Sequence, residues 1–366
     1  MRYPIAYTTG ILTALMIVAA FHAGGWWLLA IPALIYLFLP FGEQLLGLSR
    51  WPSESRIAKI TPGTARAFEA ILIAAAVTSI ALLGWALWAV SAEPVPVWKF
   101  VVLTLIVGEY SAFVGILVAH ELMHRRSPAK RRLAFLLMAL TGYAHFCIEH
   151  VRGHHLRVAT PEDPATARKG ESLYRFLPRT IIGSLRSAWR IEAERLERAG
   201  HSRWSWRNDI LRWHGFTLAL MAGIFLLLGP LALLFFVAQA GFAVFGLEAI
   251  NYLEHYGLMR EKRAGGGYER VRPEHSWNSS HFLSNINMFN LGRHSDHHAQ
   301  SNRPYYKLRH YDEAPQLPYG YTGSFLLAMV PPLWFRVMDR ELERHEASLG
   351  NQAHVPAKAG TQGGQG

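Results

Sequence analysis

Nine of the 18 histidines in this 366-residue chain fall in four short segments. The segments are HELMH at 120–124, EHVRGHH at 149–155, NYLEH at 251–255 and HSDHH at 294–298. Histidines four positions apart on a helix share one face, so their imidazoles can reach the same ion. Imidazole is a ligand suited to zinc, copper, iron and nickel. The clustering predicts a metal centre whose candidate ligands and catalytic residues are His120, His124, His150, His154, His155, His255, His294, His297 and His298.

The number of histidines bears on the number and kind of ions. Zinc takes four ligands, whereas two ions with four or five histidines each would use all nine. An all-nitrogen site with open positions fits iron and O2 better than zinc. Cys147 is the only cysteine, which excludes iron–sulfur clusters and thiolate zinc sites.

Acidic residues accompany every histidine segment. A metal-bound imidazole commonly donates its second N–H to a carboxylate, which fixes the tautomer and the orientation of the ring. Glu248 and Asn251 precede His255 by seven and four positions and share its helix face. The residues expected to support the ligands are Glu121, Glu149, Glu254, Asp296, Glu248 and Asn251.

The elements that must position these segments are apolar. Hydrophobic residues make up 51% of the chain, charged residues only 17%, and the mean hydropathy is +0.11. A soluble domain carries about 25% charged residues, and a chain this apolar does not stay disordered in water. Because one crossing needs about 20 apolar residues, we predict an all-α bundle of six transmembrane helices. The predicted spans lie near 5–21, 26–42, 70–92, 100–119, 211–228 and 230–250.

Topology follows from the loops. Lys and Arg gather in the loops 43–69 and 120–132, which predicts that these loops and both termini face the cytoplasm. The uncharged segment 133–148 has 16 residues and is ambiguous by length alone. A crossing there would carry the second histidine segment to the wrong side, so we expect it not to span.

Three regions are expected along the chain. Residues 1–256 form the bundle, with cytosolic insertions that include 120–210. Residues 257–347 form a histidine-rich cytosolic cap with the last motif, and the Gly- and Gln-rich residues 348–366 form a disordered tail.

One carboxylate, Glu109, falls near the middle of a predicted span. Intramembrane carboxylates are candidates for function, although a protonated Glu109 hydrogen-bonded inside the bundle is the slightly favoured alternative. Phe113, Ile116 and Leu117 follow on the face above His120 and are candidates to line an apolar substrate channel.

These motifs resemble the membrane alkane monooxygenases, which are non-haem di-iron enzymes of the membrane desaturase and hydroxylase superfamily. The resemblance rests on HELMHRR at 120–126, EHVRGHH at 149–155, NYLEHYGL at 251–258 and LGRHSDHHA at 291–299. EHSWNSSH at 274–281 and LRHY at 308–311 are also similar to the family. Two positions depart from its pattern: Gly292 stands where Gln is usual, and Arg125 where Lys is usual.

The resemblance implies hydroxylation of the terminal methyl of medium- or long-chain n-alkanes with O2. It implies two non-haem iron ions on the nine histidines. Electrons would come from rubredoxin, which is reduced by rubredoxin reductase, and a separate carrier is expected because one cysteine cannot build a rubredoxin site. The expected location is the bacterial inner membrane, with the lipid bilayer and an apolar hydrocarbon as partners.

Alternatives remain open from the residues alone. The chain could hydroxylate aromatic methyl groups or fatty acyl chains, or desaturate fatty acids. HELMH also fits the HExxH pattern of an intramembrane zinc protease with Glu121 as general base. A metal carrier without turnover is a non-enzymatic alternative. Nucleic acid is not expected as a partner despite the net charge of +11, because the basic residues lie mostly in membrane loops.

Overall fold

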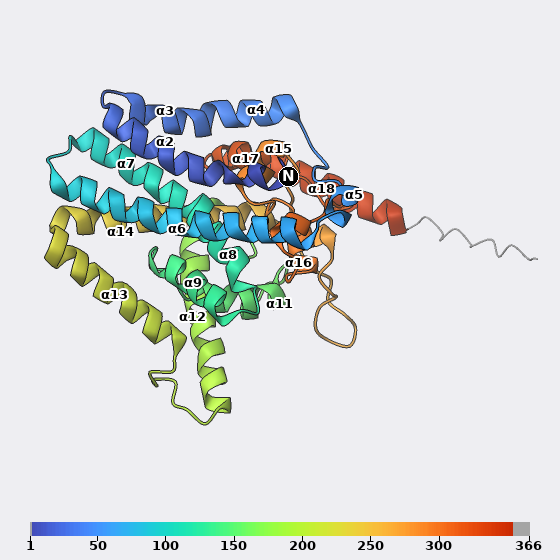
Figure 1. Ribbon diagram of the computed structural model, residues 1–366. Coiled ribbons are helices and arrows are strands. Elements are labelled where there is room, and N and C mark those ends of the chain that lie inside the picture. The colour runs from blue at the N-terminus through green and yellow to red at the C-terminus, as the bar shows by residue number, and fades with distance from the viewer. Residues whose placement is uncertain (1, 354–366) are drawn as a thin grey trace, which may run out of the picture.

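The computed structural model describes residues 2–353, which form helices joined by loops. Within this range there is no β-strand, only isolated bridges. Six helical segments are long and apolar enough to cross a membrane, and they form the bundle of Figure 1. Their bounds are Ala6–Ala23, Trp27–Leu46, Pro62–Ala92, Val97–Met123, Asp209–Leu228 and Pro230–His255. The predicted all-α fold with six membrane helices is confirmed.

Three crossings are single helices and three combine several helical pieces. The single helices are α6 (Pro62–Ala92), α13 (Asp209–Leu228) and α14 (Pro230–His255). The first crossing joins η1 (Ala6–Thr8) to α2 (Thr9–Ala23), and the second joins η2 (Trp27–Leu29), α3 (Ala30–Ala33), η3 (Leu34–Phe38) and α4 (Leu39–Leu46). The fourth joins α7 (Val97–Tyr110), the π-helical η4 (Ser111–Ile116) and α8 (Leu117–Met123).

The remaining helices lie outside the six crossings, and all of them are short except α12 and α18. They are α1 (Arg2–Ile5), α5 (Glu54–Ala58), α9 (Pro128–Ala139), α10 (Phe146–Glu149), η5 (His150–His154), α11 (His155–Arg157), α12 (Leu173–Arg198), η6 (Pro273–His275), α15 (Phe282–Asn287), α16 (His294–Ala299), η7 (Tyr305–Lys307), α17 (Gly320–Ala328) and α18 (Pro331–Ala353). In Figure 1 α12 runs across the direction of the bundle helices.

The predicted break between the last two spans occurs at Gly229. This residue has φ 86°, a left-handed conformation that glycine adopts without steric penalty. Pro230 then occupies the first turn of α14, where its missing N–H has no intrahelical partner to lose. The long apolar run therefore folds as two antiparallel crossings instead of one overlong helix.

Residues 133–148 do not form a crossing. α9 ends at Ala139, a turn follows, and the short α10 begins at Phe146. This segment is absent from the six candidate spans found in residues 2–353. The result agrees with the prediction that α8 and the second histidine segment stay at one end of the bundle.

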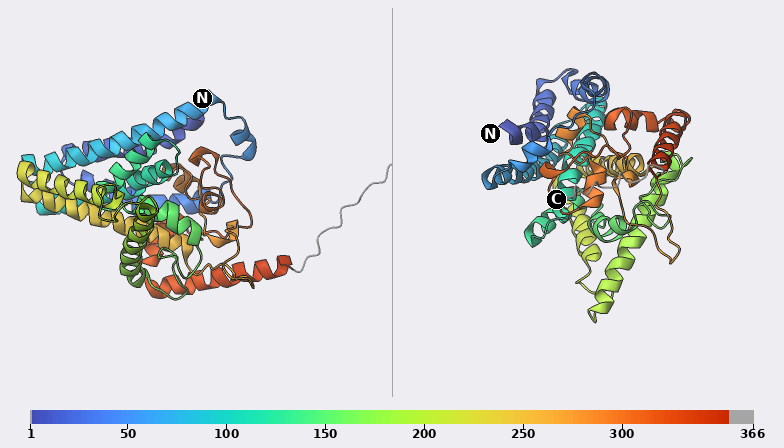
Figure 2. Two further views of the ribbon diagram at one scale, coloured as in Figure 1. Left: turned by 90° about the horizontal axis from the view of Figure 1, so that it is seen from below. Right: turned by 90° about the vertical axis from the view of Figure 1, so that its right-hand side faces the viewer.

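The part after residue 256 packs onto the bundle instead of standing apart. Trp334 and Leu342 from α18 share a hydrophobic cluster with Tyr252 of α14 and with Tyr256. Figure 2 shows α18 on the flank of the molecule opposite α6. α18 continues to Ala353, and the rest of the predicted tail, residues 354–366, lies outside the described residues.

Candidate metal centre

Two helical segments with π geometry lead into the histidines. η4 directly precedes α8, which carries His120, and η5 itself contains His150 and His154. Single π turns inside helices occur frequently at functional sites, because the wider turn changes the direction of the following side chains. Here the neighbours His154 and His155 enter two different clusters.

All nine predicted ligands gather in two groups. The first contains His120, His124, His150, His155 and His297, and the second contains His154, His255, His294 and His298. Within each group one nitrogen per residue lies within 4.8 Å of those of the others. The ring centroids of His155 and His298 are 4.5 Å apart, so the groups adjoin. We name them the five-histidine group and the four-histidine group.

Close contacts between Nε2 atoms fill both groups. In the four-histidine group, Nε2 of His298 lies 2.8 Å from that of His294 and 3.2 Å from that of His154, and His294 lies 3.1 Å from His255. In the five-histidine group, Nε2 of His155 lies 3.0 Å from that of His150 and 3.1 Å from that of His297.

These contacts fit metal ligation better than hydrogen bonding. A neutral imidazole has one N–H and one lone pair, so three converging Nε2 atoms cannot all be satisfied by one another. Metal–nitrogen bonds of about 2.1 Å at right angles place neighbouring nitrogens about 3 Å apart. Nε2 is the contacting atom in His150, His255, His297 and His298, and the Nδ1 atoms of these four rings are buried without a hydrogen-bond partner among the described residues.

The protonation of the rings also suits a metal. Burial, reinforced by neighbouring histidines, lowers the pKa well below its usual value in five rings of the cap and of the segment after α10. These are His150, His155, His294, His297 and His298. Burial also lowers the pKa of His124 to about 3. Their lone pairs are therefore free at neutral pH.

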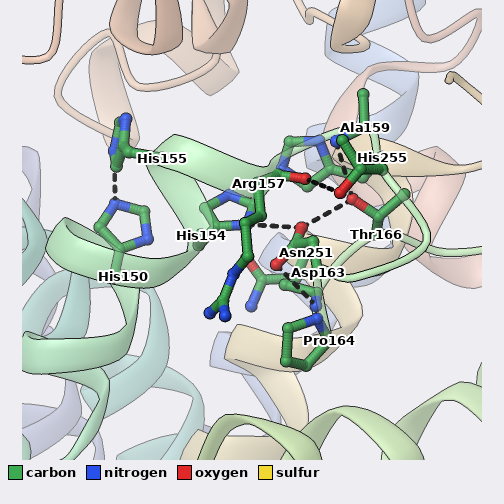
Figure 3. A network of polar contacts seen from close by, with 12 residues as sticks. His150, His154, His155, Arg157, Ala159, Asp163, Pro164, Thr166, Asn251 and His255 are labelled. Carbon is green, nitrogen blue, oxygen red and sulfur yellow. Dashed lines mark hydrogen bonds and ion pairs between the residues drawn. The ribbon is translucent and has the colours of Figure 1, made fainter. Parts of the chain in front are cut away.

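Two carboxylates touch ligand rings on the side away from the converging atoms. Asp163 Oδ2 lies 2.9 Å from Nδ1 of His154, as Figure 3 shows, and Glu254 Oε1 lies 3.2 Å from Nδ1 of His294. Tyr321 donates a hydrogen bond of 2.6 Å to Glu254. Glu254 was predicted in this role. Asp163 and Tyr321 were missed; for Asp163, a carboxylate between prolines eight positions after His155 was the available signal.

The other predicted supporting residues contact groups other than the nine rings. Glu121 accepts bonds from Arg125 and from the backbone N–H of Tyr305, and Glu149 accepts one from Arg157. Asp296 binds Arg303 at 2.5 Å, the backbone of Arg309 and Tyr311. Asn251 donates to Glu248, which also accepts from Tyr143 and Thr180. The predicted carboxylate–imidazole contact is thus found only at Glu254 in this set of the described residues.

An apolar cavity of about 370 Å³ lies among the first, second and fourth crossings and the α15 and α17 segments. Phe113 lines it, as predicted for a channel, whereas Ile116 and Leu117 are outside its lining and are buried in the two main hydrophobic clusters. Tyr321 also lines the cavity. Through Glu254, this tyrosine connects the cavity wall to the four-histidine group.

Comparisons with known proteins find one matching family model and several similar monooxygenases. The sequence model of the fatty acid desaturase family matches residues 96–328. The chain is 46% identical to the alkane 1-monooxygenase of Acinetobacter baylyi over 245 residues, which cover 67% of this chain and 60% of that protein. It is 41% identical to alkane 1-monooxygenase 1 of Alcanivorax borkumensis over 324 residues, which cover 87% of this chain and 79% of that protein. A xylene/toluene monooxygenase hydroxylase component of Pseudomonas putida is 35% identical over 221 residues, covering 60% of this chain and 58% of that protein. Several of these relatives, including the Acinetobacter protein, are thus matched over less than two thirds of their own length.

Proposed function

The chain belongs to the fatty acid desaturase family and, within it, to the alkane 1-monooxygenases, and we propose that it hydroxylates the terminal methyl of medium- or long-chain n-alkanes. The observation that carries this proposal is the convergence of nine histidines into two adjoining groups beside an apolar cavity. One oxygen atom of O2 enters a C–H bond, and the other leaves as water with two electrons and two protons.

Two non-haem iron ions are the proposed cofactors, one for each histidine group. The bound ions would supply the redox chemistry that O2 activation requires, because an alkyl C–H bond offers no acidic proton to a general base. The protein's own contribution is to hold the ligand rings in position. Asp163 holds the ring of His154, and Glu254 holds that of His294. Such contacts set the tautomer and raise the basicity of the ligand.

The cavity is the proposed binding site for the hydrocarbon. Its lining residues Met16, Leu34 and Phe38 are also exposed on the bundle surface, so the cavity reaches the face that meets lipid. An alkane carries no charge or hydrogen-bonding group, and its affinity must come from burial, about 0.8 kcal/mol for each CH2. A mouth open to the bilayer admits such a substrate without passage through water.

Rubredoxin, reduced by its reductase, is the proposed electron donor, and the bacterial inner membrane with cytoplasmic termini is the proposed location. The partly exposed His124 and His155 belong to the five-histidine group, and Leu156, which follows His155, is 71% exposed. Two ligand rings of this group thus reach the protein surface, which supports electron entry there.

The zinc protease alternative is disfavoured by Glu121. A general base must be free to take a proton from the attacking water. The carboxylate of Glu121 is buried and already accepts bonds from Arg125 and from the N–H of Tyr305.

The test is turnover by the full chain in phospholipid vesicles with NADH, rubredoxin reductase and rubredoxin. Octane, hexadecane and xylene are supplied in parallel with 18O2, and the metal content is measured. We expect 1-alkanols that carry one labelled oxygen and about two irons per chain. His297→Ala should abolish turnover and reduce the bound iron. His201→Ala, a change outside both groups, is the matched control. Product from xylene alone, one zinc per chain, or full turnover by His297→Ala would overturn the proposal.

A further inference from the structure

The unusual member of the cavity wall is Glu109. It lies on α7 inside the fourth crossing, lines the cavity and is 6% exposed. Its neighbours in the lining, such as Ile35, Ile106 and Phe113, are apolar. A hydrocarbon cavity has no need of a carboxyl group, and neither histidine group includes this one.

A second polar side chain of the cavity wall, from the second crossing, lies near Glu109. Tyr36, whose hydroxyl lies close to the Glu109 carboxyl, also lines the cavity. A carboxyl group and a phenol together offer several hydrogen-bond donors and acceptors to a ligand. A purely apolar ligand packed against them removes water and leaves this capacity unused, which is unfavourable.

The position of Glu109 defines a distance from the metal centre. It precedes His120 by eleven positions on one continuous helical crossing, so the two lie about 16 Å apart along the axis. The cavity lining includes Val114, which lies between them in the sequence, and Tyr321, which connects through Glu254 to the four-histidine group. A linear molecule with its methyl end toward the histidines can therefore place a group at its other end beside Glu109.

We propose that Glu109 and Tyr36 form a binding site for the terminal hydroxyl of a long-chain primary alcohol, whose methyl end then points toward the histidine groups. A hydroxyl both donates and accepts, and it matches a carboxyl paired with a phenol. A charged end group would lose its hydration on entering the apolar cavity, so an alcohol fits better than a carboxylate or an amine. This inference rests on the proposed function for the reaction at the methyl end, and it adds long-chain primary alcohols to the substrates.

Binding to the metal-free protein tests the site without turnover. Tritiated 1-dodecanol and tritiated dodecane are bound in parallel to the full chain in lipid nanodiscs. Glu109→Met keeps length but removes the hydrogen-bonding group, and we expect it to weaken alcohol binding about two- to twelvefold, the range for one lost hydrogen bond. Dodecane binding stays equal or tightens, and Glu109→Gln keeps most of the alcohol affinity.

Controls separate the site from the fold. Thr104→Val removes a hydroxyl from the same helix outside the cavity, where Thr104 donates a hydrogen bond to the carbonyl of Phe100. This variant should leave the affinity for both 1-dodecanol and dodecane unchanged. Tyr36→Phe is the second variant if Glu109→Met does not fold, and it should also weaken the alcohol selectively. Equal effects on both ligands, or no effect of either variant, would overturn the inference.

Turnover distinguishes this inference from the proposed function. With metal and electron donors, the wild type should convert 1-dodecanol to the α,ω-diol, and Glu109→Met should lower kcat/KM for the alcohol but not for dodecane. No product from dodecane in the wild type would contradict the proposed function. Product from dodecane with an unchanged preference in Glu109→Met would contradict only the role of Glu109.

Discussion

Oδ2 of Asp163 lies 2.9 Å from Nδ1 of His154, and this contact ties a loop between α11 and α12 to the four-histidine group. The carboxylate is fully enclosed and also accepts a 2.6 Å bond from the hydroxyl of Thr166. Burial by itself would raise the pKa of Asp163, but His154 and the hydrogen bonds keep it below its usual value. An ionised carboxylate therefore faces the ring opposite its ligating nitrogen.

Asp163→Asn should weaken metal binding about 10- to 100-fold, because the neutral amide holds and polarises His154 less strongly. The measurement is iron retained per chain after dialysis against chelators of increasing strength. The exposed neighbour provides the control, Glu162→Gln. Retention by Asp163→Asn equal to that of the control would show that the contact does not tune the site.

Gly292 allows close packing two residues before His294. A Cβ on this residue would lie 2.6 Å from the carbonyl oxygen of Ser279 and 3.0 Å from Oδ1 of Asn285. Gly292→Ala should therefore lower the free energy of unfolding by about 1–3 kcal/mol, as overpacking commonly does. Thermal unfolding in nanodiscs measures the effect.

The comparison for that variant is Gly223→Ala in α13. A Cβ on Gly223 meets nothing within 4 Å, and alanine favours a helix more than glycine does. This control should be at least as stable as the wild type. An equally stable Gly292→Ala would mean that the Ser279 loop can move away without cost.

Phe113 should influence which substrates fit, because it lines the cavity. Phe113→Leu shortens the side chain, and we expect a higher ratio of hexadecane to octane turnover. Ile116→Val, a change outside the lining, should leave the ratio unchanged. The alcohols formed from a mixture of both alkanes give the measurement, and parallel shifts in the two variants would count against this cavity as the substrate site.

His145 should make the fold sensitive to acid. It is buried against the rings of Tyr143 and His214, and neither of its nitrogens has a hydrogen-bond partner among the described residues. Burial, with a smaller contribution from His214, lowers its pKa to about 3, whereas the unfolded chain has the usual value of about 6.5. Its contribution to stability is thus fully present above about pH 6.5 and is lost as the pH falls toward 3, because the unfolded state binds the extra proton.

His145→Phe keeps an aromatic ring and removes the titration. We expect the unfolding temperature of this variant to fall less than that of the wild type between pH 7 and pH 5.5. His201→Phe, which changes a partly exposed histidine in the loop after α12, serves as the control. The same acid sensitivity in His145→Phe and in the wild type would show that His145 is not the group concerned.

Hydropathy and local spacing in the sequence were sufficient to predict much of the fold. The six crossings and the break at Gly229 follow from the length of uncharged segments and from one glycine–proline pair. Local spacing also identified the nine histidines as candidate ligands, because spacing along a helix decides which rings share a face. These signals are local, and a bilayer makes them strong, since every crossing must satisfy its own backbone hydrogen bonds.

Tertiary packing alone decided how these residues combine. The neighbours His154 and His155 enter different groups, and Asp163 rather than Glu149 or Asp296 meets a ligand ring. The cavity that contains Glu109 is enclosed by crossings far apart in the chain. Ring orientation and cavity shape depend on contacts between distant segments and on a π turn that shifts side-chain directions, and no spacing within one segment encodes either.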